Sequence, residues 1–289
     1  MHLETKAVFL DMDGTILNHH NEVTNNTKRI IDQLRAKGMI VCIATGRSLK
    51  EVYDDARSDL QVDGIVSSNG MIVYQGNDII AEHSLSRELI NEIINKAREQ
   101  EVYYELHPNE GSCITLNQDK AFVIDEIREP KPEEVGINEW LSRQAAIEKD
   151  IQWEDSVGER KYSKFYFFSR TEEKINHWID ELNELKKQID FTTSTSSNHN
   201  VEVMVAGVNK ATGIQHLLDH FGLRPEEILV VGDSNNDIPM LEFAGYSVAM
   251  KNAPDSIKQL ADEVTTYDCD EDGVYHYLKN KFLSYKQPG

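Results

Sequence analysis

Short apolar segments alternate with amphipathic segments in the first and last parts of the chain. The apolar segments are four to six residues long and lie at residues 7–10, 39–44, 64–67, 228–232, 247–250 and 263–266. Helical patterns separate them; the pattern at residues 210–221, for example, ends before Gly222. Strands that alternate with helices form parallel sheets with helices on both faces. The pattern therefore predicts an α/β fold with a doubly wound, Rossmann-like parallel sheet.

The middle of the chain, residues 84–203, has a different pattern. Amphipathic helices are expected at residues 87–99 and 172–187. Strand-like runs lie at residues 102–106, 112–116, 161–169, 189–195 and 201–205. Residues 125–160 are acidic and mixed in character, so we expect a solvated face there.

The length of the chain favours two domains. Single hydrophobic cores rarely grow beyond roughly 250–300 residues, and this chain has 289. We predict a core domain of residues 1–83 and 204–289 and an inserted α+β domain of residues 84–203. The aromatic run at residues 165–168 is expected in the hydrophobic core of the inserted domain.

Acidic residues outnumber basic residues by 50 to 30, which gives a formal net charge of −20. Binding to nucleic acid or to an anionic membrane depends on Lys and Arg, so neither partner is expected. The hydrophobic share of 39% is large enough for a folded core. No apolar run approaches the roughly 20 residues of a membrane span. We therefore predict a folded protein without a nucleic-acid or membrane partner.

Cysteine usage and the start of the chain favour the cytoplasm. Cys42, Cys113 and Cys269 are odd in number and far apart, so neither a disulfide framework nor a Cys-based zinc site is expected. The chain begins with Met-His-Leu-Glu-Thr-Lys, which lacks the pattern of a signal peptide. We predict a cytoplasmic protein that is a monomer or a weak homo-oligomer.

Two carboxylates follow the first apolar run, in the segment Asp11-Met12-Asp13-Gly14-Thr15. Asp11 can attack phosphorus and form an aspartyl phosphate, and Asp13 is placed to act as general acid and then general base. By itself the segment is more typical of a plain turn, since Asp and Gly are common turn residues.

A second acidic segment follows the run at residues 228–232 and reads Gly232-Asp233-Ser234-Asn235-Asn236-Asp237. Ligands bind where parallel strands end, at the carboxyl edge of such a sheet. Mg²⁺ prefers oxygen ligands, and Asp11, Asp233 and a backbone carbonyl would suit it. Asn236 or Asp237 also fits the N-cap of a helix expected at residues 238–243, and both interpretations can hold together.

Thr45, Gly46 and Lys210 complete the set of candidate residues. Thr45 and Gly46 follow an apolar run, where a hydroxyl and backbone N–H groups can hold phosphate oxygens. The charge of Lys210 can neutralise a phosphoryl group. By themselves these residues are more typical of a helix cap and a surface lysine. The four aspartates of the acidic segments carry four negative charges, and one Mg²⁺ with Lys210 returns three positive ones, so phosphate binding should require the metal.

These segments, in this order, resemble the motifs of the haloacid dehalogenase-like hydrolase superfamily and, within it, the Cof-type phosphatases. The resemblance extends over the whole chain. Residues 11–15 match the first motif, Thr45 fits the second, Lys210 the third, and residues 232–237 the fourth. The insertion of residues 84–203 resembles the α/β cap domain of that subgroup.

The resemblance implies a Mg²⁺-dependent phosphatase that hydrolyses small phosphorylated metabolites, such as sugar phosphates or phosphorylated cofactors. Asp11 would be the nucleophile and Asp13 the general acid and base. The implied phosphate ligands are Thr45, Gly46, Lys210 and Asn236, and the implied metal ligands are Asp11, Asp13 through its carbonyl, Asp233 and Asp237, the last directly or through another ligand. The cap would close over the site and select the substrate.

Two positions depart from the family pattern, since Ala211 and Lys251 stand where relatives usually have Gly. Lys251 would be strained if that position required a positive φ. His19 and His20, which follow the first motif, are expected to be solvated. A phosphohexomutase with the same nucleophile and a non-catalytic regulatory or binding protein are the alternatives on this fold. A phosphorelay receiver also pairs carboxylates with Thr and Lys, but it needs no insertion of this length.

Overall fold

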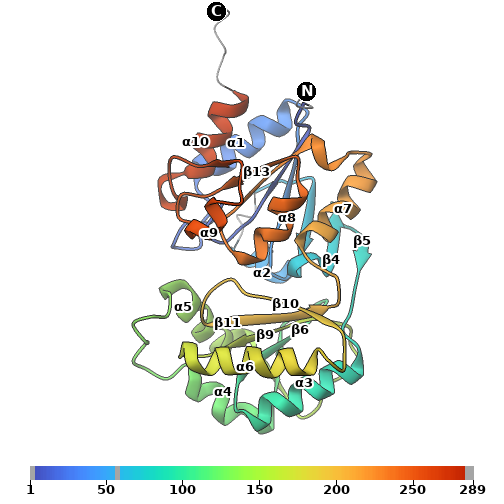
Figure 1. Ribbon diagram of the computed structural model, residues 1–289, viewed down its shortest axis with the longest axis vertical. Coiled ribbons are helices and arrows are strands. Elements are labelled where there is room, and N and C mark those ends of the chain that lie inside the picture. Colours follow the sequence, from blue (N-terminus) through green and yellow to red (C-terminus); the bar gives the residue numbers. More distant parts are fainter. Residues whose placement is uncertain (1–3, 56–58, 284–289) are drawn as a thin grey trace, which may run out of the picture. The chain divides into compact units, whose positions relative to one another are not determined.

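The computed structural model describes residues 4–55 and 59–283. The chain divides into two compact units, a core unit of Met1–Glu82 and Asn209–Gly289 and an inserted unit of His83–Val208 (Figure 1). The sequence pattern placed the end of the insertion at residue 203, a position that lies inside strand β11 (Asn200–Val205). Of the initial segment Met-His-Leu-Glu-Thr-Lys, the first three residues lie outside the described residues.

The core unit contains an eight-stranded sheet in the order β14-β13-β12-β1-β2-β3-β4-β5. Its strands are β1 (Ala7–Leu10), β2 (Ile40–Ala44), β3 (Gly64–Ser67), β4 (Ile72–Gln75), β5 (Asp78–Glu82), β12 (Ile228–Gly232), β13 (Tyr246–Ala249) and β14 (Glu263–Val264). Neighbours from β14 to β3 are parallel, and the β3–β4 and β4–β5 pairs are antiparallel. All residues of β1 and β12 are buried, as strands covered on both faces should be. The predicted α/β fold is therefore confirmed.

Helices cover both faces of this sheet (Figure 1). They are α1 (Asn25–Ala36), α2 (Leu49–Asp55), α7 (Lys210–Phe221), α8 (Ile238–Phe243), α9 (Asp255–Lys258) and α10 (Gly273–Phe282). Helices α7 and α8 pack on the face that carries Phe9 and Val230, whereas α1 packs against α10 and β2. Among the described residues, no helix combines the length and the apolar character of a membrane span.

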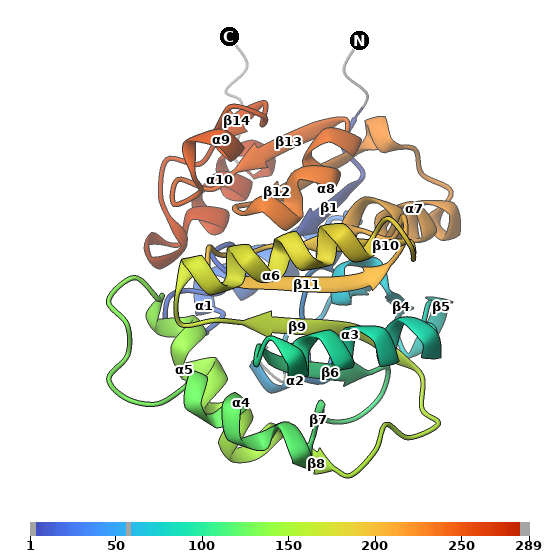
Figure 2. The same cartoon turned by 60° about the horizontal axis from the view of Figure 1, so that its bottom comes forward.

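The inserted unit has a sheet of its own, in the order β10-β11-β9-β6-β7-β8. Besides β11, its strands are β6 (Tyr103–Pro108), β7 (Ile114–Leu116), β8 (Gln152–Glu154), β9 (Tyr162–Phe168) and β10 (Phe191–Ser194). Helices α3 (Arg87–Glu99) and α6 (Glu172–Leu185) lie side by side (Figure 2) and are joined by the Lys96–Glu181 ion pair at 3.3 Å. Phe165 and Phe167 belong to the hydrophobic core beneath them, as predicted.

Residues 125–160 are more ordered than the sequence pattern indicated. They include the end of α4 (Lys120–Glu126), α5 (Ile137–Ala145), a π-helical turn (Ala146–Asp150) and β8. Glu126 is buried. Its carboxylate accepts a hydrogen bond from the Arg170 backbone N–H at 3.0 Å and pairs with Lys174, and these contacts offset the cost of burying its charge. The expectation of a solvated face is therefore wrong for Glu126.

Candidate active site

The predicted site residues of the core unit meet where its central strands end. Asp11 follows β1, Thr45 follows β2, and Asp233 follows β12. These strands are parallel neighbours, with Leu10 opposite Ile43 and Val231. Their carboxyl ends therefore share one edge of the sheet, as the topology of such folds requires of a ligand site.

Lys210 lies inside this edge and bridges two carboxylates. Its Nζ donates to Asp11 Oδ1 at 2.6 Å and to Asp237 Oδ1 at 2.7 Å, and its side chain has no exposed surface. Burial opposes the charge of Lys210, but Asp11 and Asp237 outweigh burial and raise its pKa. The position of Lys210 in the first turn of α7 is set by Asn209, which caps that helix through Thr212.

Asp237 uses both of its carboxylate oxygens as acceptors. Oδ1 accepts from Lys210, and Oδ2 accepts from the backbone N–H groups of Asp233 and Ser234 at 2.8 and 3.0 Å. Asp237 occupies the N-cap position of α8 but makes no side-chain capping bond to that helix, so the capping prediction is wrong in this respect. Its bond to the Ser234 N–H instead belongs to a capping box of the preceding 3₁₀ turn (Asn235–Asp237). Gly232 leaves room for the Asp237 side chain, since a Cβ there would lie 2.5 Å from Asp237 Cγ.

Asp11, Asp233 and Asp237 form a carboxylate cluster whose ligand atoms lie within 4.8 Å of one another. Burial and then Asp237 raise the pKa of Asp11 to about 7, and burial and then Asp11 raise the pKa of Asp233 well above its ordinary value. Asp233 Oδ1 is buried and accepts no hydrogen bond from any described residue. An oxygen cluster with excess negative charge and an unpartnered buried acceptor fits a hard divalent cation such as Mg²⁺.

The loop after β1 is held close to Asp233 by Gly14 and Asn252. Gly14 has a φ of 68°, and a Cβ there would lie 2.2 Å from Asp233 Oδ2. Asn252 Nδ2 donates to the Gly14 carbonyl at 2.8 Å and to Asp233 Oδ2 at 3.3 Å. Asn252 was not among the predicted residues, although it directly follows Lys251, which the motif comparison had singled out.

Asp13 is paired with Arg47. Its side chain is 56% exposed, and it accepts from Arg47 Nε at 2.9 Å and from Arg47 Nη2 at 2.6 Å. Partial desolvation of the Asp13 carboxylate opposes its ionisation, but the Arg47 guanidinium outweighs this effect and lowers the pKa of Asp13. Sequence reasoning missed Arg47 as a site residue, although it immediately follows Gly46.

Thr45, Gly46 and Asn236 come together through Asn69. The buried Thr45 hydroxyl accepts from the Arg47 backbone N–H at 3.1 Å. A Cβ on Gly46 would lie 3.3 Å from the Asn69 side chain, whose Oδ1 accepts from Asn236 Nδ2 at 3.3 Å. Asn69 has a φ of 54°, and its backbone N–H donates to the Thr45 carbonyl at 2.9 Å. A left-handed non-glycine residue is uncommon, although Asn adopts this conformation more readily than most residues.

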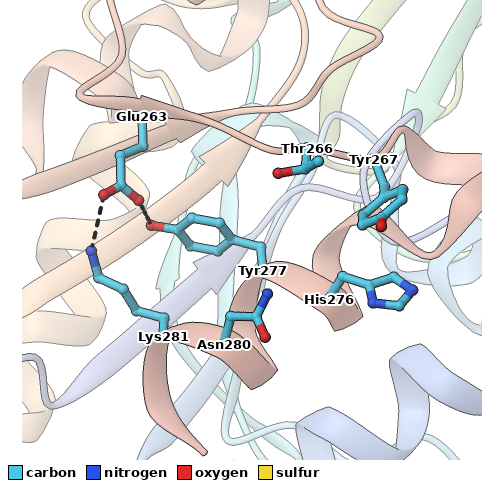
Figure 3. A pocket seen from close by; sticks show the side chains of 7 residues that line it. All are labelled: Glu263, Thr266, Tyr267, His276, Tyr277, Asn280 and Lys281. Atoms are coloured by element: carbon cyan, nitrogen blue, oxygen red, sulfur yellow. Dashed lines mark hydrogen bonds and ion pairs between the residues drawn. The ribbon is translucent and has the colours of Figure 1, made fainter. Parts of the chain in front are cut away.

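Two other features of the core unit lie outside this arrangement. A pocket of about 240 Å³ is lined by Glu263, Thr266, Tyr267, His276, Tyr277, Asn280 and Lys281 (Figure 3), none of which is a predicted site residue. Lys251 has no positive φ, so the strain considered for it does not arise, and its Nζ pairs with Glu271 at 2.8 Å.

Comparisons with known proteins extend over nearly the whole chain. Residues 8–278 match the family model of haloacid dehalogenase-like hydrolases. The 5-amino-6-(5-phospho-D-ribitylamino)uracil phosphatase YitU of Bacillus subtilis (strain 168) is 29% identical over 287 residues, which cover 97% of this chain and 99% of YitU. YcsE, a phosphatase of the same name from that organism, is 26% identical over 281 residues, with 97% of each chain covered. A solved structure of a haloacid dehalogenase-like hydrolase from B. subtilis has a TM-score of 0.80 and 24% identity, covering 95% of this chain and 99% of that one.

Proposed function

Because the chain belongs to the haloacid dehalogenase-like hydrolase family and is a phosphoric monoester hydrolase, we propose that it hydrolyses small phosphorylated metabolites by a Mg²⁺-dependent reaction. The nucleophile is Asp11, and the reaction passes through an aspartyl phosphate.

The buried contact between Lys210 and Asp11 carries this proposal. A buried ammonium is costly unless it is paired, and here Asp11 and Asp237 pair it at 2.6 and 2.7 Å. Lys210 fixes Asp11 Oδ1, so the second oxygen, Oδ2, is the one that attacks. The same ammonium is placed to neutralise charge on a phosphoryl group bound to Asp11.

In the first step, Asp11 Oδ2 attacks phosphorus, and the bond from phosphorus to the substrate oxygen breaks. Asp13 donates a proton to the leaving oxygen. Since Arg47 keeps Asp13 ionised in the resting protein, this step requires Arg47 to release that carboxylate, which then takes up a proton from solvent before it donates one to the leaving oxygen. The negative phosphoryl group of the substrate is the group that competes for the guanidinium.

In the second step, water attacks the aspartyl phosphate, and Asp13 accepts the proton of that water. The bond between phosphorus and Asp11 breaks, inorganic phosphate leaves, and the Asp11 carboxylate is restored. The ionised state of Asp13 beside Arg47 suits this step, which needs a base. Thr45, Gly46 and Asn236 bind the phosphoryl oxygens in both steps.

Asp11, Asp233 and the Asp13 carbonyl are the residues we assign to Mg²⁺. When bound, Mg²⁺ supplies positive charge to the carboxylates and to the transferring phosphoryl group. If all are ionised, the four site aspartates exceed the positive charges of Lys210 and Arg47 by two, which one Mg²⁺ matches. Because both oxygens of Asp237 already accept hydrogen bonds, we assign Asp237 to holding Lys210 rather than to the metal.

The substrate class follows from the relatives. YitU and YcsE are named for a phosphorylated ribitylamino-uracil, so that compound and common sugar phosphates head the panel to be tested. We assign the choice among them to the inserted unit, acting as a cap.

The test is a phosphate-release screen over this panel with Mg²⁺, with EDTA, and with the Asp11→Asn variant. We expect turnover that requires Mg²⁺ and is lost in Asp11→Asn. Asp219→Asn, at an exposed position of α7, is the matched control and should retain full turnover. Equal turnover in Asp11→Asn would exclude the nucleophile assignment, and isomerisation of a hexose phosphate without phosphate release would identify a mutase instead.

A further inference from the structure

Three side chains that commonly bind transition metals meet on two loops of the core unit. They are His19, in the loop after β1, and Cys269 and Asp270, in a 3₁₀ turn before α10. The ligand atoms of all three lie within 4.8 Å of one another. His19 Nδ1 lies 2.5 Å from Asp270 Oδ2 and 3.9 Å from Cys269 Sγ.

The nitrogen–sulfur separation is close to that around a zinc ion, whereas the nitrogen–oxygen separation is shorter. Zinc–nitrogen bonds are roughly 2.0–2.1 Å and zinc–sulfur bonds roughly 2.3 Å, so a tetrahedral ion holds the two atoms roughly 3.5 Å apart. The observed separation of Cys269 Sγ and His19 Nδ1 is 3.9 Å. The nitrogen and oxygen need to separate to roughly 3.4 Å. His19 and Asp270 are 58% and 48% exposed, so a small side-chain rotation is enough.

The backbone around the three residues is already fixed by hydrogen bonds. The His19 N–H donates to Asp270 Oδ1 at 2.9 Å, which ties the two loops together. The Asp268 carboxylate accepts from the N–H groups of Asp270 and Glu271 at 3.0 and 3.1 Å. Residues 268–272 read Asp-Cys-Asp-Glu-Asp, so the turn also concentrates negative charge that attracts a cation.

We propose that His19, Cys269 and Asp270 bind a transition metal ion of the zinc class. Imidazole and thiolate ligands favour such ions, whereas Mg²⁺ prefers oxygen ligands. Binding releases the thiol proton to solvent, since the thiolate is the metal ligand. Three protein ligands leave a fourth position for water or a small ligand.

The proposal differs from the expectations that the sequence raised for these residues. Cys269 was not expected in a zinc site, and His19 was expected to be merely solvated. Zinc motifs are recognised in a sequence by short spacings between ligands, whereas His19 and Cys269 are 250 positions apart. Only the packing of the η6 turn (Cys269–Glu271) against the loop after β1 brings them together.

The proposed metal site adjoins the carboxylate cluster through one side chain. The Cys269 backbone N–H donates to Asn252 Oδ1 at 3.2 Å, and Asn252 Nδ2 donates to the Gly14 carbonyl and to Asp233. A metal ion that joins His19 to Cys269 would therefore restrain both loops beside Asp233. The proposal concerns a binding site of its own and does not depend on the reaction assigned to Asp11.

The test is a titration of the reduced, tag-free protein with Co²⁺ in the presence of Mg²⁺. We expect one thiolate-to-cobalt charge-transfer band per chain, removed by an equimolar amount of Zn²⁺. Cobalt bound only by carboxylates has no such band, so the carboxylate cluster does not contribute. Hydrogen–deuterium exchange should show Zn²⁺-dependent protection in residues 14–22 and 266–272.

The variants decide between this site and adventitious binding. Cys269→Ser should abolish the band, and His19→Gln and Asp270→Asn should each weaken metal binding by at least about tenfold. The matched controls are Cys42→Ser and His220→Gln, which should leave the band and the affinity unchanged. Absence of the band in the wild-type protein, or its persistence in Cys269→Ser, would overturn the proposal. If Cys269→Ser does not fold, unchanged affinity in both exposed-residue variants would overturn it equally.

Discussion

Replacement of Asp11 by Asn should stabilise the metal-free protein, and the gain should grow with pH. The Asp11 side chain is 4% exposed, and burial followed by the charge of Asp237 raises its pKa from 3.8 to about 7. The amide oxygen of Asn can still accept the hydrogen bond from Lys210, so the substitution removes the charge and keeps this contact.

The direction of this pH dependence follows from the number of protons that the folded and unfolded states bind. Between pH 3.8 and about 7 the folded state holds a proton on Asp11 that the unfolded state has lost, so the free energy of unfolding falls as pH rises through this window. The rise of the Asp11 pKa to about 7 corresponds to a loss of about 4 kcal/mol in the free energy of unfolding at pH 8 and of roughly 1–2 kcal/mol at pH 5. Asn does not ionise and avoids this loss.

The assay is equilibrium urea unfolding in EDTA at pH 5 and pH 8, with Asp219→Asn as the matched control. It should be followed by far-ultraviolet circular dichroism, because Trp140, Trp153 and Trp178 all lie in the inserted unit and report on that unit alone. At pH 8, saturating Mg²⁺ should make the wild-type protein more stable to urea than the Asp11→Asn variant. An equal gain at both pH values, or a loss at pH 8, would refute the reasoning.

Three further predictions follow from individual contacts. Lys210→Met leaves two buried carboxylates without their counter-charge and should lower the free energy of unfolding by about 3–5 kcal/mol at pH 8; unchanged urea midpoints would contradict this. Gly14→Ala places a Cβ 2.2 Å from Asp233 Oδ2 and should weaken Mg²⁺ binding by roughly 10–100-fold in a calorimetric titration, whereas Gly76→Ala, with no atom within 4 Å of its Cβ, should not. Asp13→Asn should lower phosphate release by roughly 10²–10⁴-fold, and near-normal turnover would exclude its acid–base role.

The core sheet and its helices were predictable because their apolar residues recur with the simple spacing of strands and helices. Strands β1 and β12 are fully buried and continuously apolar, and helices α3 and α7 carry their apolar residues on one face, so their predicted limits agree with the structure. The region around α5 could not be read in this way. There Arg143 pairs with Glu105, and both are buried. A periodicity argument assigns charged residues to the surface, and it therefore fails where charges pair inside.

The residues of the candidate site also fall into two groups, those that a local sequence pattern predicts and those that only tertiary packing brings together. Residues that follow apolar strands, such as Asp11 and Asp233, are visible in the sequence because the strand end itself predicts their place. Arg47, Asn69 and Asn252 are not, since each acquires its partner only when distant segments pack: Asp13 for Arg47, Asn236 for Asn69, and Gly14 for Asn252. For Arg47 and Asn252 the only signal available was their position directly beside residues already selected by motif, whereas Asn69 has no such neighbour.

The charges at the carboxyl edge of the core sheet link the stability of the fold to the proposed function. Asp11 and Asp13 are two residues apart, yet burial and Asp237 raise the pKa of one while Arg47 lowers the pKa of the other. Environments that separate the pKa values of neighbouring carboxyl groups are the means by which one site holds two different roles. The burial of Asp11, the nucleophile that we propose, makes its ionised form unfavourable in the metal-free fold. A cation at Asp233 would relieve that cost, so metal binding, stability at neutral pH and readiness of the nucleophile should change together.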